Sequence, residues 1–230
     1  MSERWHAATG YLVIALGLAA AAFERGAPPA TAPAAEALAF SIQYRSELLT
    51  QSLLFVLSAG ACLWFFGSLR GYLQRADGPL STVAYGAGII WAGLQMVFQS
   101  GQVALALGAA PGVDPAVIGL FTDLTYALSV IAYVPLAVML AAVAVTALST
   151  GAFPAWLGWL SAVAAAGNLA MSFGIITESG PLVPGGPLTY VLYLLMALWP
   201  AAVTTVMVMR LNPNYRTTIQ RVNANRRPAM

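Results

Sequence analysis

The sequence predicts an all-α, polytopic membrane protein: a six-transmembrane-helix bundle with both termini cytoplasmic. Of its 230 residues, 60% are hydrophobic and 8% are charged, and the mean hydropathy is +0.77. A soluble domain carries roughly 25% charged residues, so this chain cannot cover its surface with groups that face water. Apolar runs of about 20 residues, the length that spans a bilayer as a helix, recur along the chain. Its arginines also cluster at one side of those runs.

The expected helices are separated by residues that begin helices and form turns. Asp77, Gly78 and Pro79 precede one apolar run, and Asp114 and Pro115 precede the next. These residues favour helix starts and tight turns. Some runs exceed the minimum spanning length, which indicates tilt or extension beyond the hydrocarbon. The six expected spans are residues 8–23, 46–69, 80–110, 116–149, 154–177 and 188–209.

The first span has a second interpretation. Arg4, a short apolar region and the alanines at 20–22 resemble a cleaved signal peptide, but we expect the segment to be retained. The outer loop that follows, residues 24–45, contains three prolines that favour extended backbone. After them, residues 34–44 form either a short amphipathic helix on the outer surface or a solvated linker. The sequence leaves both alternatives open.

The distribution of arginine predicts the orientation, since the chain contains no lysine. Arg25 and Arg45 are the two arginines assigned to the outer side, and the other eight belong to the inner side. By the positive-inside bias, both termini are expected to be cytoplasmic. The chain then divides into a six-span transmembrane domain, residues 1–211, and a basic cytoplasmic tail, residues 212–230. We expect a multi-pass protein of the plasma or inner membrane whose tail contacts anionic lipid headgroups rather than nucleic acid.

Three glutamines interrupt the third span. Gln95, Gln99 and Gln102 are four and three residues apart, so they form one stripe on a helix. An unpaired amide in hydrocarbon costs several kcal/mol, and we therefore expect the stripe to face protein, water or a ligand. Because this span runs outward, Gln95 is expected near mid-membrane and Gln102 near the outer interface.

Other spans carry polar residues at matching depth, mostly in their outer halves. This pattern predicts an outer-half polar cavity that takes a small, largely apolar molecule or a lipid. Alternatively, the same amides and hydroxyls only join helices through hydrogen bonds. The candidate ligand-binding residues are Gln95, Gln99, Gln102, Asp123, Tyr126, Tyr133, Asn168, Glu47, Gln51 and Tyr190.

The sequence offers little for catalysis. It has one cysteine and one histidine, which excludes a disulfide within the chain and the usual multi-histidine metal sites. We find no nucleophile elbow, phosphate loop or zinc-protease motif. We assign no catalytic residue and no metal ligand, and we leave the cofactor unassigned. A carboxylate pair drawn from Glu47, Asp123 and Glu178 is geometrically feasible.

Glycine spacing predicts how the helices pack. Eight pairs of glycines lie seven residues apart, a spacing that returns to nearly the same face of a helix in a left-handed bundle. Small residues on one stripe let membrane helices approach closely. We therefore expect a compact bundle with glycine seams.

Two stretches carry a resemblance to a known family. They are "FFGSLRGYLQRADGPLSTVAYGAGI", residues 65–89, and "TGAFPAWLGWLSAVAA", residues 150–165. The first places an arginine-flanked span before an acidic-glycine turn, and the second opens a span with a Pro-x-Trp-Leu-Gly-Trp entry. This pattern resembles a broad actinobacterial family of small integral membrane proteins of unassigned function. The resemblance implies a multi-span bundle and brings no activity or binding residues.

Three hypotheses for function follow. The first is binding or transport of a small, largely apolar molecule or lipid through the outer-half cavity. The second is a non-catalytic accessory subunit whose apolar and glycine faces pack against other membrane proteins or a second copy. An intramembrane enzyme that uses carboxylates is the third.

Overall fold

All the regular secondary structure is helical in the part of the chain that the computed structural model describes. The described residues are 3–28, 32–177, 180, 182 and 187–211. The tail and Glu178 lie outside them. The elements are α1 (Glu3–Ala7), α2 (Thr9–Ala21), α3 (Ala34–Gln43), α4 (Arg45–Leu73), α5 (Gly78–Gly108), α6 (Pro115–Thr150), α7 (Ala155–Ser172), the short 3₁₀ helix η1 (Phe173–Ile175) and α8 (Pro187–Arg210).

Five helices are long and apolar enough to cross a membrane. The first apolar segment is shorter: α1 and α2 together provide the stretch Trp5–Ala21. The chain is thus a multi-pass integral membrane protein. The five candidate spans are Arg45–Leu73, Gly78–Gly108, Pro115–Thr150, Ala155–Ile175 and Leu188–Arg210.

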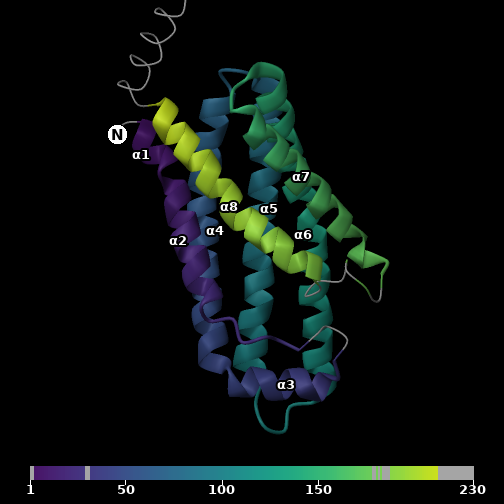
Figure 1. The fold of residues 1–230 in the computed structure, drawn as a ribbon. Coiled ribbons are helices and arrows are strands. Elements are labelled where there is room, and N and C mark those ends of the chain that lie inside the picture. Colours follow the sequence, from purple (N-terminus) through teal and green to yellow (C-terminus); the bar gives the residue numbers. More distant parts are fainter. Residues whose placement is uncertain (1–2, 29–31, 178–179, 181, 183–186, 212–230) are drawn as a thin grey trace, which may run out of the picture.

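The helices form an elongated bundle with two different ends (Figure 1). One end holds the start of α1 and the end of α8, and we call it the terminal end. The other, the α3 end, is covered by α3, which lies across the ends of α4, α5 and α6 and contacts all three. The helical alternative for residues 34–44 is therefore confirmed. Helix α8 crosses the bundle diagonally, from beside α7 to beside α1.

The helices differ in length. Helix α6 has 36 residues, which corresponds to about 54 Å at 1.5 Å per residue, whereas the hydrocarbon core is about 30 Å thick. Helices α4, α5 and α6 also reach further toward α3 than α7 and α8 do (Figure 1). Part of α6 therefore extends beyond a hydrocarbon core of this thickness.

Two aspartates begin long helices as the sequence predicts. The Asp77 carboxylate accepts from the backbone N–H of Leu80 at 3.0 Å, and that of Asp114 accepts from Ala116 at 2.9 Å. Each bond satisfies one backbone donor that a helix leaves free at its start. At the other end of α6, Gly151 adopts φ 70°, a left-handed conformation that glycine tolerates and that ends helices.

The core fills the terminal half of the bundle with large apolar side chains. The indole of Trp199 on α8 is 1% exposed and packs edge-on against Phe65 of α4, with ring centroids 6.3 Å apart. Other fully buried members of the core are Met139, Leu140 and Val143 of α6, Leu157 of α7 and Met207 of α8. Burial of such side chains fixes α4, α6, α7 and α8 against one another.

The glycine seams differ from the prediction in which glycines make contact. A Cβ atom at Gly88 would lie 2.9 Å from Phe66, and one at Gly101 would lie 2.5 Å from Thr125. By contrast, both members of the 60/67 and 86/93 pairs have open space where a Cβ would stand. A seven-residue spacing places two glycines on one face, but that face can point outward as readily as inward.

Candidate ligand-binding hollow

A chain of hydrogen bonds joins three helices in the half of the bundle near α3. The Gln102 amide nitrogen on α5 donates to the Gln51 side-chain oxygen on α4 at 3.0 Å. The Gln51 amide nitrogen then donates to the Glu24 carboxylate at 3.0 Å, just after α2. Gln51 is only 5% exposed. Its side-chain nitrogen and oxygen are both hydrogen-bonded, which avoids the cost of a buried polar atom without a partner.

The carboxylate fixes the direction of this chain. An ionised carboxylate only accepts hydrogen bonds, so the Gln51 nitrogen must face Glu24 and its oxygen must face Gln102. The other oxygen of Glu24 accepts from the Gly26 backbone at 3.2 Å. As the Gln102 nitrogen is the donor at the far end, its own side-chain oxygen remains an acceptor that this chain does not use.

Gln99, one helical turn before Gln102, presents a second acceptor. Its side chain is 4% exposed, and its oxygen Oε1 is fully buried without a hydrogen-bond partner among the described residues. Such an orphan acceptor costs roughly 1–3 kcal/mol, and native structures contain few of them. Gln95 is half-buried on the same face. The stripe thus places an unsatisfied oxygen inside the bundle.

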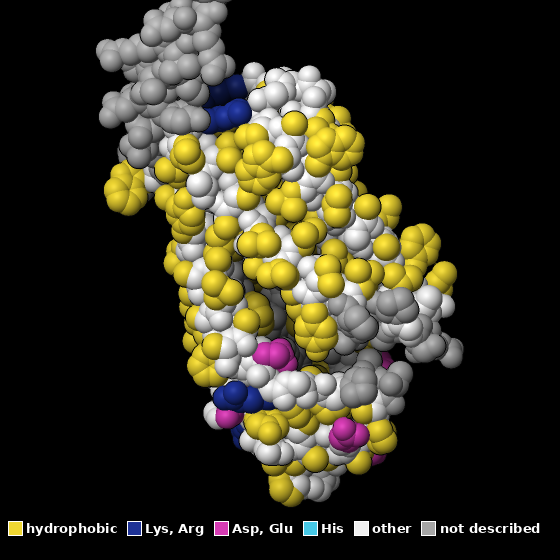
Figure 2. Space-filling view, in the orientation of Figure 1, with side chains coloured by type: hydrophobic (Ala, Val, Ile, Leu, Met, Phe, Trp, Pro, Cys, Tyr) yellow, Lys and Arg dark blue, Asp and Glu magenta, His cyan; other side chains and the backbone are white. Residues whose placement is uncertain are grey.

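The surface of the bundle near α3 is hollowed. Figure 2 shows a deep recess between α2 and α8, above α3, with an acidic side chain at its lower edge. Tyr193 of α8 is 61% exposed, and its ring packs edge-on against that of Tyr190.

Helix α6 forms part of the wall near α3. Thr125 is buried, and its side chain fills the place that a Cβ at Gly101 would take. The Tyr126 hydroxyl donates to the Gly174 carbonyl at 3.3 Å and so joins α6 to η1. Tyr126 and Tyr133 lie within electrostatic range of each other. These contacts hold α6 close to α5 at the depth of the glutamines.

The remaining predicted site residues have other surroundings. Asp123 is exposed. The Glu47 carboxylate accepts from the Ser46 hydroxyl at 2.8 Å. Asn168 is 1% exposed, and its amide nitrogen donates to the Ala164 carbonyl of its own helix at 2.8 Å. Tyr190 is 63% exposed and packs edge-on against Tyr193. The hydrogen-bond chain therefore unites only Gln51 and Gln102 from the predicted set.

Sequence reasoning missed Glu24, the last member of the hydrogen-bond chain; Tyr193 belongs with Tyr190 to the polar residues expected at this depth of the last span but is not among the candidate site residues. Glu24 lies just outside the first apolar span, and a charge there reads as a loop residue that faces water. Glu24 follows the end of the first apolar span, at the depth where the next span begins, and this position is the sequence signal that could have placed it near Gln51. Tyr193 lies three residues after Tyr190 and shares its helical face.

The hollow offers hydrogen-bond acceptors and aromatic surface. Among the described residues, no group of three or more His, Cys, Asp or Glu side chains could hold a metal ion. Within the described part of the chain, the side-chain oxygens of Gln99 and Gln102 accept no hydrogen bond, and the Glu24 carboxylate bonds Gln51, the partner of Gln102. Acceptors of this kind pair chemically with groups that donate hydrogen bonds.

Comparison with known proteins adds no relative: no family profile, curated protein or solved structure matches this chain. Its likeness to an actinobacterial family of small membrane proteins therefore stays a prediction.

Proposed function

We propose that this protein binds a small, largely apolar molecule or lipid in the hollow between α2 and α8, and that the ligand carries a hydrogen-bond donor such as a hydroxyl or an amine. Its apolar part would lie against Tyr133 and Tyr193. Its donor would reach the oxygens of Gln99 and Gln102. Binding is the first step of transport, so the same site serves a transporter or a binding protein.

The buried Gln99 oxygen carries this proposal. Leucine at that position would avoid the cost of an orphan acceptor, yet the chain has a glutamine there. A hydrogen bond from a ligand to the Gln99 oxygen would remove the cost of the unpaired acceptor and so contribute to the binding free energy. The direction of the Gln102–Gln51–Glu24 chain also favours a ligand that donates a hydrogen bond, because the side-chain oxygen of Gln102 is not used within the chain.

The test is to purify the full chain in a mild detergent and quantify the small molecules and lipids that remain bound by mass spectrometry. We expect a donor-bearing apolar compound to be enriched over bulk lipid. Gln99→Leu should lower its occupancy about tenfold, which corresponds to ~1.4 kcal/mol. Gln74→Leu is the matched control, because Gln74 is exposed at the terminal end.

The proposal fails if no compound is enriched, or if both variants retain it equally. A compound lost from both variants together with the fold would also count against a specific role for Gln99. Circular dichroism of each variant distinguishes that outcome from a local effect.

We also propose six spans with both termini cytoplasmic. The arginine distribution supports this orientation, and the start of α1 and the end of α8 lie at one end of the bundle (Figure 1). In this arrangement α2 is the shortest span and the α3 end faces outward. The hollow then opens in the outer half of the protein.

An accessory subunit is the second candidate, and the outward glycines favour it. Gly60 of α4 and Gly86 and Gly93 of α5 have open space where a Cβ would stand. Smooth faces of this kind let a helix of another membrane protein approach closely. A stoichiometric protein in the same purification, without an enriched small molecule, would support this candidate over the first.

A further inference from the structure

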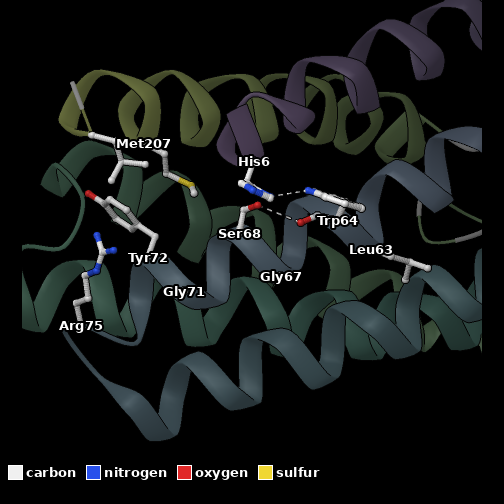
Figure 3. A pocket seen from close by; sticks show the side chains of 10 residues that line it. His6, Leu63, Trp64, Gly67, Ser68, Gly71, Tyr72, Arg75 and Met207 are labelled. Carbon is white, nitrogen blue, oxygen red and sulfur yellow. Dashed lines mark hydrogen bonds between the residues drawn. The ribbon is translucent and has the colours of Figure 1, made fainter. Parts of the chain in front are cut away.

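A second concave site lies in the opposite half of the bundle. A groove of about 420 Å³ runs along α4 at the terminal end, in the size range of small-molecule sites. Helix α4 provides most of its lining, and α1 and α8 stand beside it (Figure 3). The hydrogen-bond chain and Gln99 contribute nothing to it, so its role is independent of the proposed function.

The groove is open because two glycines form part of its lining. Gly67 and Gly71 lie one helical turn apart on α4, and a Cβ at either would meet nothing within 4 Å. Leu63 and Trp64 continue the same face and are 37% and 55% exposed. An extended apolar chain could therefore enter sideways from the bilayer and lie along this face.

Polarity changes along the groove. Figure 3 shows Leu63 at one end and Arg75 at the other, with His6 between them. Because α4 runs toward the terminal end, Leu63 lies deeper in the membrane and Arg75 lies near the interface. A phospholipid has the same gradient, with its acyl chain toward the membrane centre and its headgroup at the interface.

His6 presents a donor in the middle of the groove. The Trp64 indole nitrogen, which only donates, bonds His6 Nδ1 at 3.1 Å, and the two rings are nearly parallel at 9°. The proton of neutral His6 must then sit on Nε2, the nitrogen that Trp64 does not engage. This Nε2–H is available to a phosphate oxygen.

The charge of this end selects an anionic occupant. Three arginines belong to the terminal end: Arg75 lines the groove, Arg70 lies over the Tyr85 ring, and Arg210 donates to backbone carbonyls of residues 151 and 152. The tail that follows Leu211 carries Arg216, Arg221, Arg226 and Arg227.

We propose that this groove binds one anionic phospholipid, with an acyl chain along Leu63, Trp64 and Gly67 and its phosphate near His6 and Arg75. The rim of aromatic side chains suits the interfacial depth. The positive end attracts a negatively charged headgroup more than a zwitterionic one.

Native mass spectrometry of the full chain tests this, with phosphatidylglycerol and phosphatidylcholine of matched acyl chains as probes. The wild-type protein should retain phosphatidylglycerol preferentially. Gly67→Leu should reduce that binding about tenfold, since leucine fills the groove and is well tolerated in a helix. Gly60→Leu is the matched control: it lies one heptad away on α4 in similarly open space but outside the groove.

The headgroup claim has its own variants. Arg75→Gln should reduce the preference for phosphatidylglycerol about fivefold and leave phosphatidylcholine unchanged. A full chain with its four tail arginines changed to glutamine should keep the preference. The proposal is overturned if Gly67→Leu and Gly60→Leu behave alike, if the wild type binds both lipids equally, or if neutralising the tail abolishes the preference. Ligand occupancy in the hollow should not change in any of these variants.

Discussion

The indole nitrogen of Trp199 donates a hydrogen bond to the hydroxyl of Ser161, 2.8 Å away, and the two side chains are 1% and 0% exposed. This bond joins α8 to α7 inside the apolar core. The Ser161 hydroxyl in turn donates to the Leu157 carbonyl at 2.8 Å. One serine thus satisfies the only donor of the largest buried side chain.

Ser161→Ala should lower the free energy of unfolding by about 1 kcal/mol, since it leaves the buried indole N–H without a partner. Thermal unfolding in detergent, followed by circular dichroism, measures the change. Ser149→Ala is the control, because that exposed hydroxyl only bonds the Val145 carbonyl of its own helix. Equal stability of the two variants would contradict the structural role of the Trp199 bond.

Gly88→Leu should destabilise the bundle by about 1–3 kcal/mol through overpacking. A Cβ at Gly88 would stand 2.9 Å from Phe66 and 3.1 Å from Met139. Gly93→Leu on the same helix should be neutral or slightly stabilising, because its Cβ meets nothing and leucine favours helix. The measurement is the thermal unfolding midpoint of each variant. A larger fall in the midpoint for Gly93→Leu than for Gly88→Leu would refute this packing.

Gln51 and Gln102 should be energetically coupled. A double-mutant cycle with Gln51→Leu and Gln102→Leu should give a coupling of about 0.6 kcal/mol, the average for hydrogen bonds between membrane helices. The parallel cycle of Gln51→Leu with Gln99→Leu should give a value near zero, as those two residues share no hydrogen bond in the structure. Similar coupling in both cycles would argue against the directed chain.

Cysteine labelling should report the orientation. The native Cys62 is buried at 4% exposure, so a membrane-impermeant maleimide should leave the wild type unlabelled. In intact cells, Glu36→Cys on α3 should react from outside, whereas Ser2→Cys and Asn223→Cys should react only after permeabilisation. Strong external labelling at either terminus would reverse the proposed topology.

The basic tail should bind anionic membranes through its arginines. A detached peptide of residues 212–230 should associate with anionic liposomes, and replacement of Arg216, Arg221, Arg226 and Arg227 by glutamine should weaken this association by about 1 kcal/mol per arginine. Higher salt should weaken it as well, because mobile ions screen the attraction. Equal binding of the charged and neutralised peptides would remove the claim.

Local signals in the sequence predicted the helix boundaries well. Asp77 and Asp114 cap their helices because a short acidic side chain at the start of a helix can accept hydrogen bonds from the backbone N–H groups of the first turn. Long-range geometry was harder to predict. Gly88 has no glycine seven residues away, yet it makes one of the closest helix contacts, because the bulky Phe66 determines where a small residue is needed.

The polar site shows the same limit. The spacing of Gln99 and Gln102 predicted one helical face, and burial of Gln99 fits that face. The partners depend on how helices rotate and tilt, which hydropathy does not encode. Thus Gln51 meets Gln102, whereas Asn168 at comparable burial bonds its own backbone. Glu24 joined the site because the chain after α2 turns back across α4, a path that no local pattern specifies.

The contacts of α2 have a consequence for the order in which the bundle assembles. Helix α2 packs against both α4 and α8. Tyr11 bonds Thr205 across 194 residues at 3.0 Å, and a Cβ at Gly10 would clash with the side chain of Thr204. As a helix, the apolar stretch Trp5–Ala21 is about 26 Å long, less than the thickness of the hydrocarbon core. The contacts of α2 with α4 can form as soon as α4 has been synthesised, whereas those with Thr204 and Thr205 can form only after synthesis has reached α8.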